Sequence, residues 1–271
     1  MHNKSELDRR LELAGVKPLK KLGQNFLLNP KICESLVAAV SEFKPSSVVE
    51  IGPGLGALTD SLLKRAWRNI LIEVDSGLVE FWKKQNPTLE IIHKDALHIE
   101  WENLNLENPS VLVSNLPYSI AASLVVELSA KSHPFSALVL MFQKEVAERI
   151  AAPVSSADYG MLSVIAQTNW KISKLIDAGP QDFFPVPHVG SRVLVFTPLQ
   201  TQFSKEKFLG FVKLAYSQRR KKLISNLSGS YKRPELELHF SALGLSQDSR
   251  AQELSPEQFV ALFKASEKDG I

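Results

Sequence analysis

The chain has 271 residues, of which 44% are hydrophobic and 23% charged, which is typical of a globular protein with one sizeable core and room for a small second domain. The single cysteine, Cys33, excludes an internal disulfide and a cysteine-cluster zinc site, and the scattered histidines lack metal-ligand spacing, so we expect no metal. No apolar run approaches the roughly 18 residues of a membrane span, and the polar N-terminus lacks a secretory core. We therefore expect a cytoplasmic protein.

The net charge of +3 is unevenly distributed along the chain. Residues 1–24, which include Lys20 and Lys21, carry six Lys or Arg against three Asp or Glu, and residues 201–271 carry 12 against eight. Residues 25–200 carry 14 against 18. A single basic cluster is usually only solvated surface, but two basic ends beside one ligand-binding domain favour a polyanionic partner such as nucleic acid.

The N-terminal part predicts a helix and then a loop over a ligand. Residues 1–16 are polar with some helical periodicity, and GQNFLLNP follows at residues 23–30. Its final Asn-Pro is a good start for a helix over residues 30–40. Asn25 and Leu27 then remain to face a ligand.

The sequence VVEIGPGLGALTD at residues 48–60 predicts a strand, a glycine turn and a helix start. Such a turn, here with Gly52 and Gly54, directs unpaired backbone N–H groups at a ligand above it. The next predicted strand, residues 69–72, ends at Glu73, whose carboxylate can accept hydrogen bonds from ribose hydroxyls. The pattern predicts a nucleoside-bearing cofactor, with NAD among the possibilities, although glycines alone also fit a plain tight turn.

Two further strand ends carry polar groups. A helix over residues 78–85 precedes a strand over residues 89–93, and Asp95 follows directly. The strand at residues 111–113 runs into Asn-Leu-Pro-Tyr at 115–118. Ligands bind at the carboxyl edge of open α/β sheets, where Asp95 can accept a hydrogen bond from an adenine amine, although a surface-turn aspartate is equally compatible.

The Asn-Leu-Pro-Tyr turn predicts methylation of an aromatic amine. The amine lone pair is delocalised into the ring, so the nitrogen attacks a methyl group poorly until its hydrogens are held out of the ring plane. The Asn115 side-chain carbonyl and a neighbouring backbone carbonyl can accept those hydrogens, and Pro117 stiffens the turn. Tyr118 can stack on a purine. A proline-stiffened turn without any function has the same composition.

Three later apolar segments, residues 136–142, 170–176 and 191–196, are predicted strands. The sequence FFPVP between the last two can present Phe184 to a base that has left its stack, opposite Tyr118. A core position for this phenylalanine is equally compatible with the sequence.

A domain boundary is predicted at residues 197–201. A helical stripe then runs from Phe208 to Leu223, and a basic cluster lies near its end: Arg219, Arg220, Lys221 and Lys222. Ser255 begins a capping box for the last helix. We expect this helical part, with the basic N-terminus, to bind an RNA helix by its backbone.

A series of segments in order spans nearly the whole chain: GQNFL (23–27), EIGPGLGALT (50–59), IEVD (72–75), DAL (95–97), NLPYSIA (115–121), QKEVAERIAA (143–152), DYGMLSV (158–164), FFPVPHV (183–189) and QRRKKLISNL (218–227). Together they resemble the rRNA adenine dimethyltransferase family, and within it the members that act on small-subunit (16S) rRNA.

The resemblance implies S-adenosylmethionine as the cofactor. It also implies transfer of two methyl groups to N6 of each of two adjacent adenosines in the 3′-terminal hairpin of small-subunit rRNA, within the assembling ribosomal subunit. By motif position, the implied cofactor contacts are Asn25, Leu27, Glu50, Gly52, Gly54, Glu73, Asp95 and Asn115. The implied catalytic residues are Asn115, Leu116, Pro117, Tyr118 and Phe184. We expect RNA binding by Lys20, Lys21, Arg219, Arg220, Lys221 and Lys222, a monomer, and no membrane contact.

Some positions depart from the family pattern. Ser119 stands where Asn is common, Gly190 and Arg192 replace an acid and a small residue, and Lys222 replaces a hydroxyl residue. These departures bring into question the geometry of the loop at residues 188–192.

Three alternatives differ in class. The large-subunit methyltransferases of macrolide resistance usually carry Ile in place of Leu116. A non-catalytic nucleic-acid-binding relative does not need residues 115–118 intact. An NAD dehydrogenase requires a proton relay that the sequence lacks. The predicted fold is α/β, a Rossmann-like S-adenosylmethionine-dependent methyltransferase sheet over residues 1–200 with a small all-α RNA-docking domain over residues 201–271.

Overall fold

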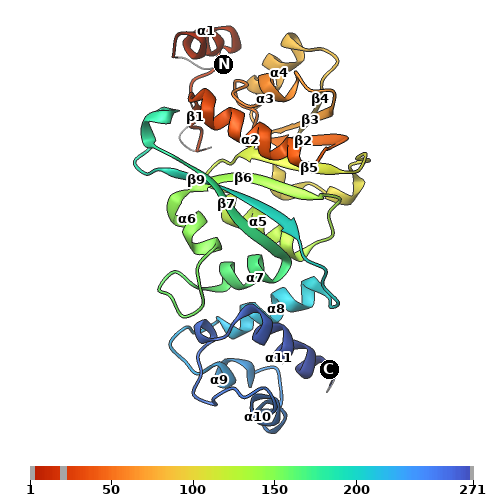
Figure 1. Ribbon diagram of the computed structural model, residues 1–271, viewed down its shortest axis with the longest axis vertical. Coiled ribbons are helices and arrows are strands. Elements are labelled where there is room, and N and C mark those ends of the chain that lie inside the picture. The colour runs from red at the N-terminus through yellow and green to blue at the C-terminus, as the bar shows by residue number, and fades with distance from the viewer. Residues whose placement is uncertain (1–3, 19–22, 269–271) are drawn as a thin grey trace. The chain divides into compact units, whose positions relative to one another are not determined.

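The computed structural model describes residues 4–18 and 23–268 (Figure 1). The chain divides into two compact units. The first comprises the chain up to residue 124 together with residues 132–147 and 172–198, and the second comprises residues 125–131, 148–171 and the chain from residue 199 onward. The second unit thus takes in two segments that precede residue 200, and the division into functional domains at that residue stays a prediction.

The described residues form a seven-stranded sheet in the order β4-β3-β2-β5-β6-β9-β7. Every strand expected from the sequence is present: β2 (Ser47–Ile51), β3 (Arg68–Glu73), β4 (Glu90–His93), β5 (Ser110–Asn115), β6 (Ala137–Gln143), β7 (Trp170–Ala178) and β9 (Ser191–Pro198). The five strands β2 to β6 run parallel, and β9 pairs antiparallel with β6. The connections run outward on both sides of the β2–β5 pair, so the carboxyl ends of these two strands form the switch point where open α/β sheets bind ligands.

Helices alternate with the parallel strands and confirm the predicted α/β class: α1 (Lys4–Ala14), α2 (Pro30–Glu42), α3 (Thr59–Leu62), α4 (Ser76–Gln85), α5 (Ala121–Ala130), α6 (Lys144–Ile150) and α7 (Met161–Asn169). Helix α2 begins as expected, because the Asn29 side chain accepts a 3.0 Å hydrogen bond from the Lys31 N–H and Pro30 occupies the first turn. The α2 stripe Ile32, Leu36 and Val40 is buried in the same core as Val48 of β2 and Val113 of β5.

A second, small sheet was not expected from the sequence. Strand β1 (Phe26–Leu27) pairs antiparallel with β8 (Phe183–Phe184), with Phe26 opposite Phe184. This pairing fastens the segment at residues 23–30 to the distant FFPVP loop. Two-residue strands carry almost no periodic signal, which explains why the sequence does not predict them.

The second unit holds the C-terminal helices α8 (Lys205–Ala215), α9 (Leu223–Leu227), α10 (Arg233–Ala242) and α11 (Pro256–Lys268). Phenylalanines dominate its core: Phe208, Phe211, Phe240, Phe259 and Phe263. The predicted capping box of α11 is confirmed by reciprocal hydrogen bonds between Ser255 and Gln258 of 2.9 and 3.2 Å. Among the described residues, no helix combines the length and apolar character that a bilayer crossing requires.

The helical stripe predicted from Phe208 to Leu223 is wrong as one helix. Helix α8 ends at Ala215, and the basic cluster lies in the turn between α8 and α9. The side chain of Asn226, from α9, donates to the carbonyls of Ala215 and Gln218 at 2.7 and 3.1 Å. These bonds stabilise the turn, because the last carbonyls of a helix otherwise lack partners.

Candidate cofactor and substrate site

A pocket at the carboxyl edge of the sheet brings the predicted site together. Its walls come from residues 23–27, 50–55, 57–58, 72–74, 94–96 and 115–120, with Leu78. All the predicted cofactor contacts line it: Asn25, Leu27, Glu50, Gly52, Gly54, Glu73, Asp95 and Asn115. Leu116, Pro117 and Tyr118 line the same pocket, so the ends of four strands, β2, β3, β4 and β5, and the N-terminal loop contribute to one site.

The glycine turn after β2 requires its glycines. Gly52 and Gly54 have φ of +63° and +53°, which side-chain-bearing residues rarely adopt. A Cβ atom on Gly54 would lie 3.0 Å from Cε1 of Phe26. The backbone can therefore approach a ligand closely, as a site for a nucleoside-bearing cofactor needs.

Glu73 ends β3 at the pocket wall and is only 5% exposed. Its Oε1 accepts hydrogen bonds of 2.8 and 2.9 Å from the N–H groups of Val74 and Asp75, which orient the carboxylate. Burial raises the pKa of Glu73, and these backbone donors oppose that rise. A buried, oriented carboxylate at this position is suited to accept hydrogen bonds from the two hydroxyls of a ribose.

Asp95 both lines the pocket and caps a turn. It lines the pocket, and its Oδ1 accepts a 2.9 Å hydrogen bond from the Leu97 N–H at the start of a short 3₁₀ turn, Ala96–His98. This hydrogen bond holds the carboxylate in place through Oδ1. The second oxygen, Oδ2, lies 3.7 Å from Nδ1 of His98.

Asn115, at the end of β5, is fixed by the N-terminal loop. Its Nδ2 donates a 2.9 Å hydrogen bond to the backbone carbonyl of Asn25. The nitrogen end of the amide is thereby engaged, and the side-chain oxygen is the end that remains to accept a hydrogen from a ligand amine. The Leu116 N–H donates to the carbonyl of Met141 at 3.3 Å, which attaches the turn to β6.

Tyr118 is held by a residue that the sequence did not single out. Its hydroxyl lies 3.0 Å from Oγ of Ser191, which is fully buried at the start of β9. Burial raises the pKa of Tyr118, so the hydroxyl is a neutral hydrogen-bonding group at physiological pH. A lone serine at a strand start is too common for sequence to reveal this contact.

Glu50, on β2 just before the glycine turn, is 3% exposed, and its Oε2 accepts a 2.8 Å hydrogen bond from the Thr59 hydroxyl. Burial raises the pKa of Glu50 to about 8, and this hydrogen bond opposes the rise. In its protonated form this carboxyl can donate as well as accept a hydrogen bond in the pocket lining.

Phe184 lies outside this set, since the described residues that line the pocket do not include it. It is half-buried on β8, and Nζ of Lys4 lies 5.5 Å from its ring centroid. Its contact with a target base stays a prediction.

The departures at Gly190 and Arg192 have local partners. The Arg192 guanidinium pairs with Asp177 at 2.6 Å, and the Gly190 carbonyl accepts from the Lys144 N–H at 2.9 Å. A Cβ on Gly190 would lie 2.9 Å from the carbonyl oxygen of Ala178. Gly190 and Arg192 therefore both fit their surroundings at the point where the loop meets β9.

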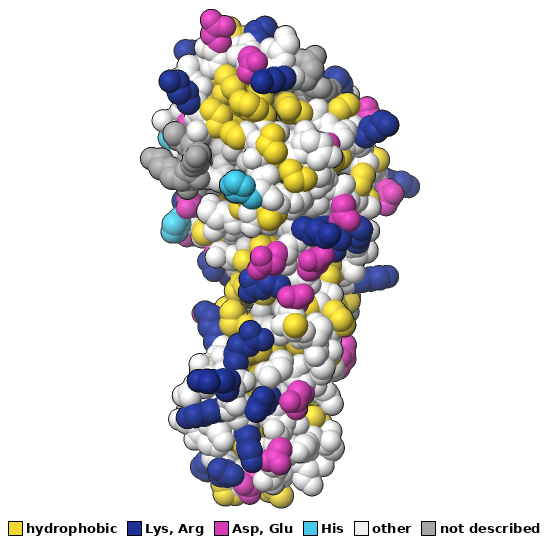
Figure 2. Space-filling model, turned by 90° about the vertical axis from the view of Figure 1, so that its left-hand side faces the viewer, with side chains coloured by type: hydrophobic (Ala, Val, Ile, Leu, Met, Phe, Trp, Pro, Cys, Tyr) yellow, Lys and Arg dark blue, Asp and Glu magenta, His cyan; other side chains and the backbone are white. Residues whose placement is uncertain are grey.

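The predicted RNA-binding residues Arg219, Arg220, Lys221 and Lys222 are all exposed. Lys222 forms an ion pair with Asp248, and Nη2 of Arg219 lies 3.5 Å from the Tyr159 carbonyl. Figure 2 shows Lys and Arg side chains gathered on one face of the second unit. Lys20 and Lys21 lie outside the described residues.

Comparison with known proteins adds family information. A family model described as ribosomal RNA adenine dimethylase matches residues 16–268. The chain is 44% identical to the "ribosomal RNA small subunit methyltransferase A" of Bdellovibrio bacteriovorus, covering 97% of each protein, and 35% identical to the protein of the same name from Desulfitobacterium hafniense, covering 99% of each.

Two solved structures are similar over most of their length. A dimethyladenosine transferase from Plasmodium falciparum is 26% identical with a TM-score of 0.74, covering 88% of this chain and 95% of that one. The 23S rRNA methyltransferase ErmE is 25% identical with a TM-score of 0.64, covering 89% and 99%.

Proposed function

Because the chain belongs to the ribosomal RNA adenine dimethylase family, we propose that it transfers methyl groups from S-adenosylmethionine to N6 of two adjacent adenosines in the 3′-terminal hairpin of small-subunit rRNA, two to each. The observation that carries this proposal is the set of strand-end residues around one pocket, with the Asn115 amide oriented by Asn25. It is an enzyme, and its cofactor is S-adenosylmethionine.

The chemistry of the residues that line the pocket supports that cofactor. We propose that Glu73 holds the ribose, Asp95 the adenine amine, and the turn with Gly52 and Gly54 the part between the ribose and the methionine, with Asn25 and Leu27 covering it. Glu50 would face the methionine end. When bound, S-adenosylmethionine supplies an electrophilic methyl group on sulfur.

The residues of the Asn-Leu-Pro-Tyr turn would bind and orient the target amine. The Asn115 side-chain oxygen and the Leu116 carbonyl accept its two hydrogens, which frees the nitrogen lone pair from the ring and stabilises the positive charge that develops on nitrogen. Pro117 restricts the turn, and Tyr118 stacks on the base. A strong general base is unnecessary, because the nitrogen loses its proton after attack. The rate would come mainly from alignment of the reacting atoms.

We propose that the basic turn between α8 and α9 binds the rRNA backbone while the pocket of the first unit binds the flipped base. The substrate would be rRNA within the assembling small subunit, and the protein would act as a monomer in the cytoplasm. The resemblance to ErmE keeps large-subunit rRNA as the alternative substrate. The small-subunit relatives, at 44% and 35% identity over almost the full chain, favour the first.

The test incubates the protein with methyl-labelled S-adenosylmethionine and small ribosomal subunits from cells that lack the modification. The RNA is then digested to nucleosides. We expect label in N6,N6-dimethyladenosine and none with large subunits. Label only with large subunits would support the alternative, and intact cofactor binding without any label would indicate a non-catalytic relative.

A further inference from the structure

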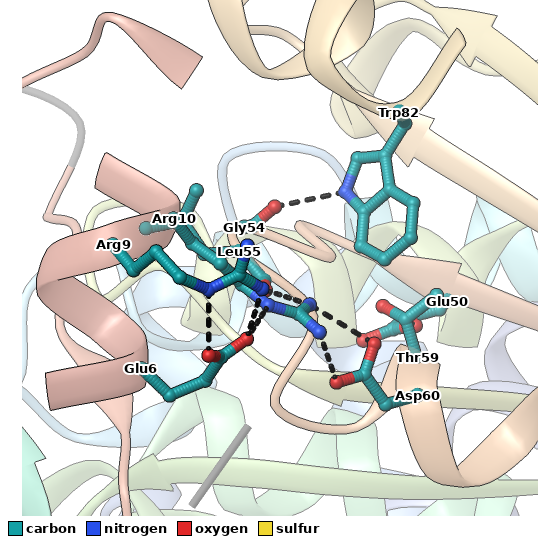
Figure 3. Close-up of polar contacts among 9 residues, drawn as sticks. All are labelled: Glu6, Arg9, Arg10, Glu50, Gly54, Leu55, Thr59, Asp60 and Trp82. Carbon is teal, nitrogen blue, oxygen red and sulfur yellow. Dashed lines mark hydrogen bonds and ion pairs between the residues drawn. The ribbon is translucent and has the colours of Figure 1, made fainter. Parts of the chain in front are cut away.

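The glycine turn is held by two side chains that lie outside the pocket lining (Figure 3). Nε1 of Trp82, on α4, donates a 2.9 Å hydrogen bond to the Gly54 carbonyl. Nη1 of Arg10, on α1, donates a 2.8 Å hydrogen bond to the carbonyl of Leu55. Two consecutive peptide groups of the turn therefore have their carbonyls fixed by donors from two different helices.

Fixing these carbonyls also fixes the N–H groups. A trans peptide is planar, so its N–H points opposite to its C=O. With the Gly54 carbonyl directed at Trp82, the N–H of Leu55 is directed away from Trp82, and Leu55 is one of the residues that line the pocket. The Gly56 N–H, opposite the Leu55 carbonyl, closes the turn on the Pro53 carbonyl at 2.9 Å.

Arg10 is itself rigidly placed. It forms ion pairs with Asp60 at 2.8 Å and Glu6 at 2.9 Å, and its side chain is 18% exposed. A Cβ on Gly56 would lie only 2.6 Å from Nη1 of Arg10, so the close approach depends on glycine at that position. The guanidinium thus joins α1, the glycine turn and the start of α3 in one contact set (Figure 3).

We propose that Arg10 is a positioning residue for the cofactor site: it holds the glycine turn in the geometry that binds S-adenosylmethionine and touches no reacting group. The inference rests on the proposed function only for the identity of the cofactor. Arg9 provides a matched control, because it is exposed and bonds to Glu6 on its own helix without reaching the turn.

The test compares R10Q, R10K and R9Q in the full chain. Direct binding of S-adenosylmethionine is measured by calorimetry, together with kcat, KM for each substrate, and Tm. For R10Q we expect the Kd and KM for S-adenosylmethionine to rise about tenfold, the cost of losing a charge-assisted hydrogen bond. We expect kcat at saturating cofactor and KM for the RNA to stay within about twofold of wild type, with R10K intermediate and R9Q like wild type.

Other outcomes are distinguishable. An unchanged Kd in R10Q, or an equal rise in R9Q, would overturn the positioning role. If R10Q does not fold, R10K tests the same proposal. An unchanged Kd for S-adenosylmethionine in R10K would contradict it. Failure of the wild-type protein to bind S-adenosylmethionine would instead contradict the proposed function.

Discussion

The side-chain amide of Asn115 donates a 2.9 Å hydrogen bond to the backbone carbonyl of Asn25, although the two residues are 90 positions apart in the chain. The bond connects the Asn-Leu-Pro-Tyr turn at the end of β5 to the N-terminal loop. It engages the nitrogen end of the amide, so the side-chain oxygen is the end that remains to accept a hydrogen bond. The N-terminal loop and the Asn-Leu-Pro-Tyr turn are therefore joined directly in the lining of one pocket.

Replacing Asn115 with alanine should abolish most methyl transfer and leave RNA affinity unchanged. The variant loses the oxygen that accepts the amine hydrogen, and loss of such a group typically lowers kcat by about 10²–10³-fold. Single-turnover methylation and RNA binding by filter retention measure the two effects separately. Parallel loss of both would mean that Asn115 is only structural.

Tyr118→Phe should lower kcat by about tenfold or less, whereas Tyr118→Ala should lower it much further. The phenylalanine keeps the stacking face and loses only the contact with Ser191, and a hydrogen bond contributes about 0.5–1.5 kcal/mol. Ser191→Ala is the matched variant from the other side and should resemble Tyr118→Phe. Equal activity of Tyr118→Ala and Tyr118→Phe would contradict a stacking role.

The raised pKa of Glu50 predicts that the stability of the protein depends on pH. In the unfolded chain its carboxyl ionises near pH 4.5, but burial in the folded protein raises the pKa to about 8. Between these values the unfolded state has released a proton that the folded state still holds, so the free energy of unfolding falls as pH rises and levels off above about pH 8.

Glu50→Gln should remove that dependence and still accept the Thr59 hydrogen bond. The free energy of unfolding of the variant, relative to that of wild type, should increase by on the order of a few kcal/mol from pH 5 to pH 8. Urea unfolding without cofactor at both pH values measures this difference. The exposed Glu42→Gln is the control and should show no such gain. A gain that is the same at both pH values would contradict the assignment.

The basic turn should determine the salt dependence of RNA binding. Arg220→Gln or Lys221→Gln should weaken binding and reduce the slope of log K against log salt by about 0.7–0.9 for each charge removed. Lys222→Gln should have a smaller effect, because Lys222 is paired with Asp248. Equal effects at the three positions would mean that the ion pair opens when RNA binds.

Local signals in the sequence predict much of this fold. The strands, the glycine turn and the starts of α2 and α11 follow from apolar runs, glycines and caps, which act within a few residues. The polar residues that end β2, β3 and β5 could be assigned to one edge because parallel strands present their carboxyl ends together. The residue at which α8 ends could not be predicted, because the turn that follows α8 is stabilised by Asn226 from the next helix.

The sequence by itself determined the parallel α/β sheet and the set of strand-end residues that line one pocket, because each depends on residue type and short-range spacing. Only the tertiary structure decided which distant partners complete the site: Asn25 for Asn115, Ser191 for Tyr118, and Arg10 for Leu55. These contacts depend on strand order and register, which place residues far apart in the chain within hydrogen-bonding distance. No local pattern encodes that distance.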